Sequence, residues 1–309
     1  MADLTLLLPP LSRVVEQAPS CELAFWTARG DRLADASAGR DAMLREAFEF
    51  IGTTIPFAAL TRSLDSADAA GTLWLRADPA WVVADAVTLR LLACGNMDLS
   101  PAESGELARS LKPLLGDAGF LLEATTPSRW YLRCPSGAKL PAFSPPQAAL
   151  GDDVARHLPE GEAGRRWQHL LNEAQVILHN HPLNAERTRR GLPPVNSLWF
   201  WGAGTLPEWV RTAASTVVSA DEIVLALARL AKIPVVDSLA LDAAAEDSHI
   251  VLDADASAAP EGTWQSIQQA MTQRVIGELR LSFASGERYR YRHGHRWRFW
   301  RKVPAKAKA

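Results

Sequence analysis

The chain has 309 residues, of which 48% are hydrophobic and 22% are charged, a composition typical of a folded protein with a sizeable core. Its formal net charge of −2 excludes an overall electrostatic attraction to nucleic acid or acidic lipid. No apolar run approaches the roughly 20 residues of a transmembrane helix, and the first residues lack the basic region of a secretory signal. We therefore expect a cytoplasmic protein that makes no membrane contact.

The first part of the chain predicts a buried strand over residues 4–8, followed by helices. Apolar residues recur at helical spacing over 41–52 and over 81–93, so both stretches are predicted helices. A further helix begins at Ser100, because Glu103 stands at the capping-box position three residues later. These helices are expected to cover a sheet.

A hairpin and a linker are predicted next. Residues 119–125 and 129–134 are rich in apolar residues and flank a short turn, which favours a β-hairpin. Residues 135–151 are rich in Pro and Gly and indicate a surface linker. The predicted domains are therefore an N-terminal α/β part over 1–134 and a C-terminal α/β part over 152–309, sharing one core.

The second part alternates helices and strands. The predicted helices cover residues 164–181, 219–232 and 262–279, and the predicted strands cover 196–201, 233–236, 248–255 and, as an antiparallel meander, 278–300. Ser219 and Glu222 form a second predicted capping box. Strands alternating with helices predict an α/β fold with a mostly parallel central sheet flanked by helices, followed by the C-terminal antiparallel hairpin.

Residues 179–204, HNHPLNAERTRRGLPPVNSLWFWGAG, concentrate polar, basic and aromatic side chains. His179 and His181 lie two residues apart, which argues against a two-histidine metal clamp on one helix face. The amides and guanidinium groups can fix a turn or bind an anionic ligand. Trp199 and Trp201 alternate along a strand and so face the same side. The candidate ligand-binding residues are His181, Asn184, Arg187, Asn196, Trp199, Trp201, Gly202 and Gly204.

The pattern HPxNxxRxxxGxxxxNxxWxWGxGxxP over residues 181–207 resembles the archaeal-type cofactor-independent phosphoglycerate mutases. The likeness continues through STVVSADEIVLALARLAKIPVVD and, more faintly, GDRLADASAGR at 30–40. The resemblance implies an alkaline-phosphatase-like fold in a degenerate form. The chain is also similar over most of its length to the RpfE-type bacterial regulatory protein family, in stretches such as LTLLLPP, RWYLR and WRFW.

The metal-binding loops that this resemblance implies differ in this chain. The family's first strand ends in an Asp-Gly pair, whereas here Pro9 and Pro10 follow LTLLL. Positions matching the family's second ligand cluster hold Val251, Ala256 and Pro260, none of which ligates a metal. We expect no metal site, no cofactor and no catalytic residue.

The C-terminal segment RYRYRHGHRWRFWRK at 288–302 alternates arginine with aromatic residues. Such a segment can dock a protein or stack single-stranded nucleic acid, or it can be a soluble edge hairpin with inward-packed rings. The acidic net charge makes nucleic acid the less favoured partner. The candidate interaction residues are Arg288, Arg290, Arg292 and Trp297.

Three hypotheses follow. The favoured one is a non-catalytic regulatory protein that senses an anionic or phosphorylated metabolite on a phosphoglycerate mutase-like fold. An alternative is a metal-dependent mutase or phosphohydrolase whose metals are held by Asp31, Asp35, Asp253 and Asp255. The third is an interaction module that uses the C-terminal segment to bind an unidentified partner.

Overall fold

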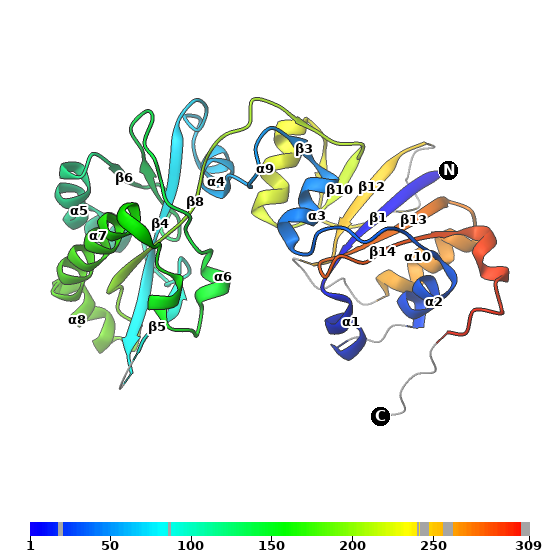
Figure 1. The fold of residues 1–309 in the computed structure, drawn as a ribbon, viewed down its shortest axis with the longest axis horizontal. Coiled ribbons are helices and arrows are strands. Elements are labelled where there is room, and N and C mark those ends of the chain that lie inside the picture. Colours follow the sequence, from blue (N-terminus) through cyan, green and yellow to red (C-terminus); the bar gives the residue numbers. More distant parts are fainter. Residues whose placement is uncertain (18–20, 86–87, 240, 242–246, 256–261, 304–309) are drawn as a thin grey trace. The chain divides into compact units, whose positions relative to one another are not determined.

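The structure is a computed structural model that describes the chain except for residues 18–20, 86–87, 240, 242–246, 256–261 and 304–309. The chain forms two compact units (Figure 1). Unit 1 consists of Met1–Thr53 and Trp209–Ala309, and unit 2 of Thr54–Glu208. This division differs from the predicted boundaries around 135–151, because the first strand pairs with strands near the other end of the chain and so joins both ends in one sheet.

Unit 1 contains a seven-stranded sheet in the order β11-β10-β12-β1-β13-β14-β2. Its strands are β1 (Ala2–Leu8), β2 (Asp31–Arg32), β10 (Thr216–Val218), β11 (Val235–Val236), β12 (His249–Asp253), β13 (Ile276–Phe283) and β14 (Arg288–Arg292). The pairings from β11 to β13 are parallel, while β14 is antiparallel to both β13 and β2. The predicted α/β class with a mostly parallel sheet and a C-terminal antiparallel hairpin is confirmed.

The two faces of this sheet differ in chemistry. Along β1, residues Leu4, Leu6 and Leu8 point to one face and are buried among apolar side chains of α2 (Cys21–Arg29) and α10 (Thr263–Thr272). Helix α10 packs on β13 and helix α2 on β14, as Figure 1 shows. The other face carries Thr5, and opposite it in the register stands Arg280 of β13. One face is therefore a hydrophobic core and the other, here called the polar face, is mixed.

Further elements of unit 1 are α1 (Leu11–Gln17), α3 (Arg40–Ala47), α9 (Glu222–Ala231), the 3-10 helix His293–Trp297 and the antiparallel pair β3 (Glu49–Phe50) and β9 (Val210–Arg211). Helix α9 has its N-cap two residues after Ser219, the predicted capping residue. Its N-cap is Asp221, whose carboxylate accepts hydrogen bonds from the backbone N–H groups of Ile223 and Val224. The side chain of Ser219 binds elsewhere and does not cap this helix, so the second capping box was wrong.

Unit 2 contains an antiparallel sheet centred on β4 (Leu73–Ala84), which pairs with β5 (Leu89–Cys94), β7 (Trp130–Arg133) and β8 (Ser197–Thr205). Strand β6 (Leu121–Ala124) pairs with β7 and completes the predicted hairpin. The helices are α4 (Phe57–Asp65), α5 (Pro101–Asp117), α6 (Pro146–Ala149), α7 (Gly161–His179) and α8 (Pro182–Arg189), with a 3-10 helix at Val154–His157. Helices α5 and α7 pack on each other, and their apolar stripes share a core with the sheet.

Two predictions in unit 2 had opposite outcomes. The capping box of α5 is confirmed, since Ser100 and Glu103 each bond the other's backbone N–H. The predicted helix at 81–93 is wrong, because this stretch forms the end of β4 and the start of β5. Val82 is buried in a cluster with Trp199 of β8, so sheet pairing outweighs the helical spacing of the apolar residues.

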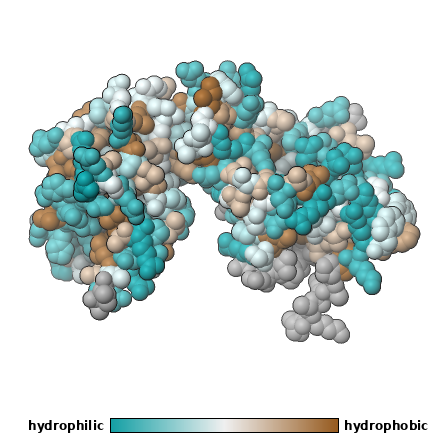
Figure 2. Space-filling model, in the orientation of Figure 1, coloured by the Kyte–Doolittle hydropathy of each residue, from teal (hydrophilic) through white to brown (hydrophobic). Residues whose placement is uncertain are grey.

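Hydrophilic residues cover much of the visible face of each unit, and hydrophobic residues form patches among them (Figure 2). Within the described part of the chain, none of the helices combines the length and the apolar character that crossing a bilayer requires.

Candidate functional site

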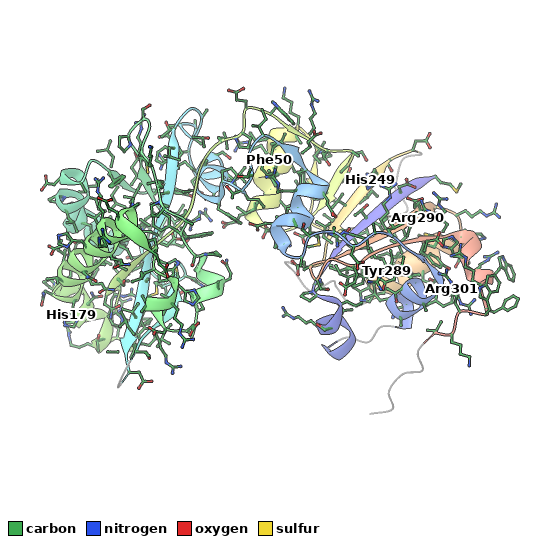
Figure 3. All side chains as sticks on the ribbon, in the orientation of Figure 1. Phe50, His179, His249, Tyr289, Arg290 and Arg301 are labelled. Atoms are coloured by element: carbon green, nitrogen blue, oxygen red, sulfur yellow. The ribbon has the colours of Figure 1, made fainter. Side chains whose placement is uncertain are left out.

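The predicted ligand-binding residues lie in unit 2, around α8 and β8. His179 ends α7 (Figure 3), and His181 is the N-cap of α8, where its Nδ1 accepts a hydrogen bond from the N–H of Leu183 at 3.3 Å. The amide of Asn184 donates to the carbonyls of Leu178 and Val195 and accepts from the Val195 N–H, all within 2.8 Å. Asn184 thereby fixes the loop that connects α8 to β8.

Arg187 is fully buried and joins α8 to the start of α5. Its guanidinium donates to the backbone carbonyls of Pro193 at 3.1 Å, Met97 at 2.5 Å and Asp98 at 3.4 Å. Glu103 lies 3.6 Å away and also binds the exposed Arg190. Internal groups thus occupy the forked donors that suggested an anion site.

The remaining motif residues also have internal partners. Asn196 bonds both the N–H and the carbonyl of Val82 in β4. Trp199 and Trp201 are buried on the same side of β8, as predicted, and their ring N–H groups donate to the Ser144 carbonyl and to Asp78. Residues 181–204 thus act as a scaffold for unit 2, and ligand binding by them stays a prediction.

Gly202 and Gly204 are required by close packing. A Cβ on Gly204 would lie 2.4 Å from the Cβ of Pro56, and a Cβ on Gly202 would lie 2.8 Å from the Cβ of Phe57. Gly202 also has φ +68, a conformation that side chains other than glycine rarely adopt. Both glycines therefore let β8 approach the start of α4.

An arginine lies at the carboxyl ends of two neighbouring parallel strands of unit 1, β10 and β12. Ligands of open α/β sheets usually bind at this edge. Arg40, the first residue of α3, donates to both carboxylate oxygens of Asp253 at 2.8 and 3.1 Å and to Asp255 at 3.0 Å. Asp221 lies 3.3 Å from the same guanidinium, and the hydroxyl of Ser219 donates to Asp253 at 2.8 Å. We call these residues the Arg40 cluster.

Electrostatics keep the Arg40 cluster tightly paired. Burial by itself lowers the pKa of Arg40, but hydrogen bonds and charges from Asp253, Asp221 and Asp255 outweigh it and raise the pKa above the ordinary value. The side chain of Asp253 is fully buried, and its bonds to Arg40 offset the cost of burying a carboxylate. The positive charge at the strand ends is therefore supplied by the protein itself.

The metal site implied by the phosphoglycerate mutase resemblance does not fit these residues. A guanidinium already binds the oxygens of Asp253 and Asp255 that a divalent ion would take. Asp31 pairs with Arg298, and Asp35 pairs with Arg32. The described ranges contain no group of three or more His, Cys, Asp or Glu residues suited to a metal ion. Ala256 and Pro260, from the second ligand motif, lie outside the described residues.

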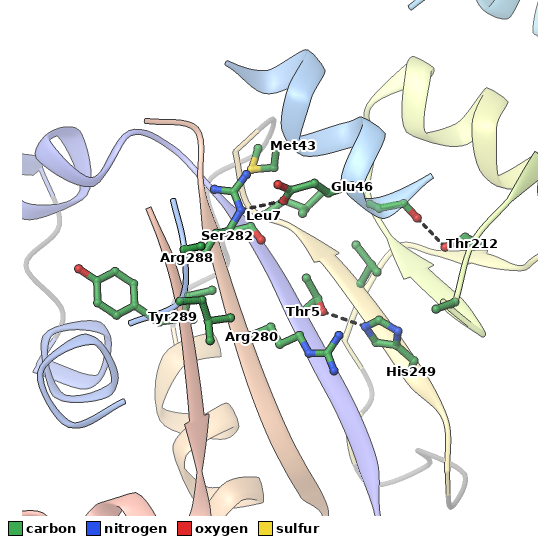
Figure 4. A pocket seen from close by; sticks show the side chains of 16 residues that line it. Thr5, Leu7, Met43, Glu46, Thr212, His249, Arg280, Ser282, Arg288 and Tyr289 are labelled. Carbon is green, nitrogen blue, oxygen red and sulfur yellow. Dashed lines mark hydrogen bonds and ion pairs between the residues drawn. The ribbon is translucent and has the colours of Figure 1, made fainter. Parts of the chain in front are cut away.

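A cavity of about 390 Å³ lies on the polar face of the unit 1 sheet, beneath α3 (Figure 4). Thr5 of β1, His249 of β12 and Arg280 of β13 contribute polar side chains from three adjacent strands, and Arg288 of β14 lies near Glu46 of α3. We call this space the sheet cavity. Its other lining residues are Leu7, Leu33, Ala34, Met43, Ala47, Thr212, Ala213, Val251, Leu281, Ser282 and Tyr289.

Sequence reasoning did not select the polar residues of the sheet cavity, apart from Arg288. The signal was the alternation in DLTLLL and ELRLSF, where Thr5 and Arg280 interrupt apolar runs with period two. Arg40 was also missed, although it ends the GDRLADASAGR stretch. The polar residues of the sheet cavity and of the Arg40 cluster are spread over most of the chain, so no local sequence motif contains them all.

The predicted interaction residues are only partly exposed. Arg288 is buried, whereas Arg290 and Arg292 pair with Asp31 and Glu278. Trp297, Phe299 and Trp300, at the end of the described chain, are largely exposed. The arginines of β14 therefore serve unit 1 itself, and docking by this segment stays a prediction.

Sequence comparison finds relatives over part of the chain. A probable 2,3-bisphosphoglycerate-independent phosphoglycerate mutase of Geobacter sulfurreducens is 32% identical over 109 residues, which are 35% of this chain and 27% of that protein. A 2,3-bisphosphoglycerate-independent phosphoglycerate mutase of Methanosarcina mazei is 35% identical over 66 residues, 21% of this chain and 17% of that protein. No family model matches the chain.

Two solved structures were also compared. A cofactor-independent phosphoglycerate mutase from Thermoplasma acidophilum has a TM-score of 0.41 and 18% identity, covering 95% of this chain and 90% of the other. A protein from Pyrococcus horikoshii has a TM-score of 0.47 and 13% identity, covering 94% and 86%. The sequence matches support the likeness to cofactor-independent phosphoglycerate mutases, but they span at most about a quarter of the length of the two relatives named above.

Proposed function

We propose that this chain binds a small anionic molecule on a phosphoglycerate mutase-like framework and does not catalyse metal-dependent phosphoryl transfer. The observation that argues against metal-dependent phosphoryl transfer is the Arg40 cluster. A guanidinium keeps its positive charge at all physiological pH values and matches carboxylates in a fork geometry. With Arg40 among Asp221, Asp253 and Asp255, the strand ends hold a permanent internal cation in place of an exchangeable one. A regulatory role, as in the RpfE-type proteins, is part of the proposal.

Metal analysis and a mutase assay test this proposal together. The purified full chain, dialysed and then incubated with Mn²⁺ or Mg²⁺, is expected to retain substoichiometric metal. It is also expected not to interconvert 2-phosphoglycerate and 3-phosphoglycerate in a coupled assay. Stoichiometric Mn²⁺ together with turnover would overturn it.

A metal-dependent phosphoglycerate mutase or phosphohydrolase is the second candidate, favoured by the names of the two relatives found by sequence. In that case Asp253 would be a metal ligand, and Arg40 would have to leave its carboxylate. Asp253→Asn would then abolish turnover, while Asp152→Asn, at an exposed carboxylate of unit 2 that pairs with His157, would retain it. Wild-type turnover that survives Asp253→Asn would count against this candidate.

A further inference from the structure

We propose that the sheet cavity of unit 1 binds the oxyanion group of a small molecule, a phosphate or a carboxylate, through Arg288 and Arg280. The inference rests on the proposed binding function and names its site. It uses neither the motif residues of unit 2 nor the Arg40 cluster.

Arg288 has a donor without an acceptor. Its Nε donates to Glu46 at 2.7 Å, and its Nη1 donates to the carbonyls of Phe283 at 2.7 Å and Glu287 at 3.0 Å. Nη2 is buried and has no hydrogen-bond partner among the described residues. Only 8% of the Arg288 side chain is exposed. A buried, charged donor left unpaired costs free energy, and an oxyanion supplies the missing acceptor.

Arg280 supplies a second guanidinium on the same face. It stands opposite Arg290, and Ser282, two residues along β13, stands opposite Arg288, so the two arginines of the sheet cavity are diagonal neighbours. The Nε of Arg280 donates to Glu278 at 2.7 Å, while about half of the side chain, 52%, is exposed. Figure 4 shows its guanidinium beside His249. Arg280 can therefore turn toward a ligand with little loss of internal packing.

His249 and Thr5 form a neutral polar edge to the same space. The Thr5 hydroxyl lies 2.8 Å from Nε2 of His249. Burial, and then the positive charge of Arg280, lower the pKa of His249, so the imidazole stays neutral at neutral pH. Two neutral groups that both donate and accept hydrogen bonds suit the hydroxyl groups of a small organic acid.

Charge and size agree on the class of ligand. The charged side chains that line the sheet cavity are two guanidinium groups and the carboxylate of Glu46, so the lining is net positive when His249 is neutral. A volume of about 390 Å³ falls in the range of small-molecule sites, and several lining residues are apolar. The sheet cavity therefore favours a compact organic anion over a large nucleotide or a peptide.

Equilibrium titration of the full chain with inorganic phosphate and, separately, with malonate tests the site and separates the two oxyanions. Arg280→Gln removes one guanidinium at a half-exposed position, and Arg288→Lys keeps the charge but removes the unpaired Nη2. Arg189→Gln, at an exposed residue of unit 2, is the control for the change in net charge. Circular dichroism melts establish that each variant is folded.

Each cavity variant is expected to weaken binding of the preferred oxyanion about tenfold or more, with the control within about twofold of wild type. Equal affinity in wild type and both cavity variants would overturn this site and leave a binding function elsewhere intact. Absence of saturable binding up to about 10 mM of either anion would overturn the site as well. Mn²⁺-dependent turnover would instead contradict the proposed function, and the two failures are distinguishable.

Discussion

The scaffold of residues 181–204 in unit 2 and the polar face of unit 1 both contain buried arginines, but they use them differently. The donors of Arg187 reach three backbone carbonyls of unit 2, and Glu103 lies beside them. Arg288, which lines the sheet cavity, reaches Glu46 and two carbonyls, and its Nη2 has no hydrogen-bond partner within the part of the chain that the structure describes. The polar side chains of a motif that is dense in sequence can thus all bond within the local structure, whereas the polar side chains of the sheet cavity come from strands that are distant in sequence.

The largest expected effect is the loss of Arg187. Arg187→Met should lower the free energy of unfolding by about 3–5 kcal/mol, because it leaves buried carbonyls and Glu103 without their partner. Denaturant unfolding measures this change, and Arg189→Met, at an exposed residue, should stay within about 0.5 kcal/mol. A stable Arg187→Met protein that loses anion binding would instead place the ligand in unit 2.

The Arg40 cluster should give the next effect. Arg40→Met leaves the buried Asp253 without its guanidinium and should cost about 2–3 kcal/mol. Because Asp221, Asp253 and Asp255 then lack an internal cation, added Ca²⁺ should raise the Tm of Arg40→Met and leave that of wild type unchanged. Thermal melts with and without Ca²⁺ check this, and a metal-induced rise in wild type would contradict the role given to Arg40.

Close packing at Gly204 should give a smaller effect. Gly204→Ala places a Cβ 2.4 Å from the Cβ of Pro56 and should destabilise by about 1–3 kcal/mol. Gly105→Ala, within α5 and with open space around its Cβ, should stabilise by about 0.5–1 kcal/mol. Urea unfolding of the pair tests packing directly, and a neutral Gly204→Ala would favour a role in ligand approach.

An ion pair in unit 2 should give the smallest effect. Hydrogen bonds from Arg62 lower the pKa of Asp68 to about 2 against the opposing effect of burial. Because folding lowers this pKa, the stabilisation is present above the ordinary value of 3.8 and is lost as the pH falls through about 2. Asp68→Asn should therefore cost at most about 1 kcal/mol at neutral pH, since Asp68 is partly exposed.

Urea midpoints measured over a pH series check this expectation. The difference between Asp68→Asn and wild type should shrink as the pH falls below 3.8. A difference that does not change with pH would show that the two proteins differ through packing and not through charge.

Local signals predicted the elements well where the physics is local. The capping box of Ser100 and Glu103 depends on residues within one helical turn, and both of its bonds are present. At Asp221, a stronger acceptor two residues after Ser219 caps α9, because Ser219 is bound to Asp253 from another strand. The stretch 81–93 forms strands because the end of β4 pairs with β5, and Val82 is buried in a cluster with Trp199 of β8.

By itself, the sequence determined the helices with local caps, the alternation that makes one sheet face polar, and the likeness to phosphoglycerate mutases. Only the tertiary structure decided which arginines are satisfied. A guanidinium's partners depend on carbonyls and carboxylates that lie far away in sequence, such as Met97 for Arg187 and Asp253 for Arg40. Hydrogen-bond satisfaction is a property of the assembled fold, and so is the unpaired donor of Arg288.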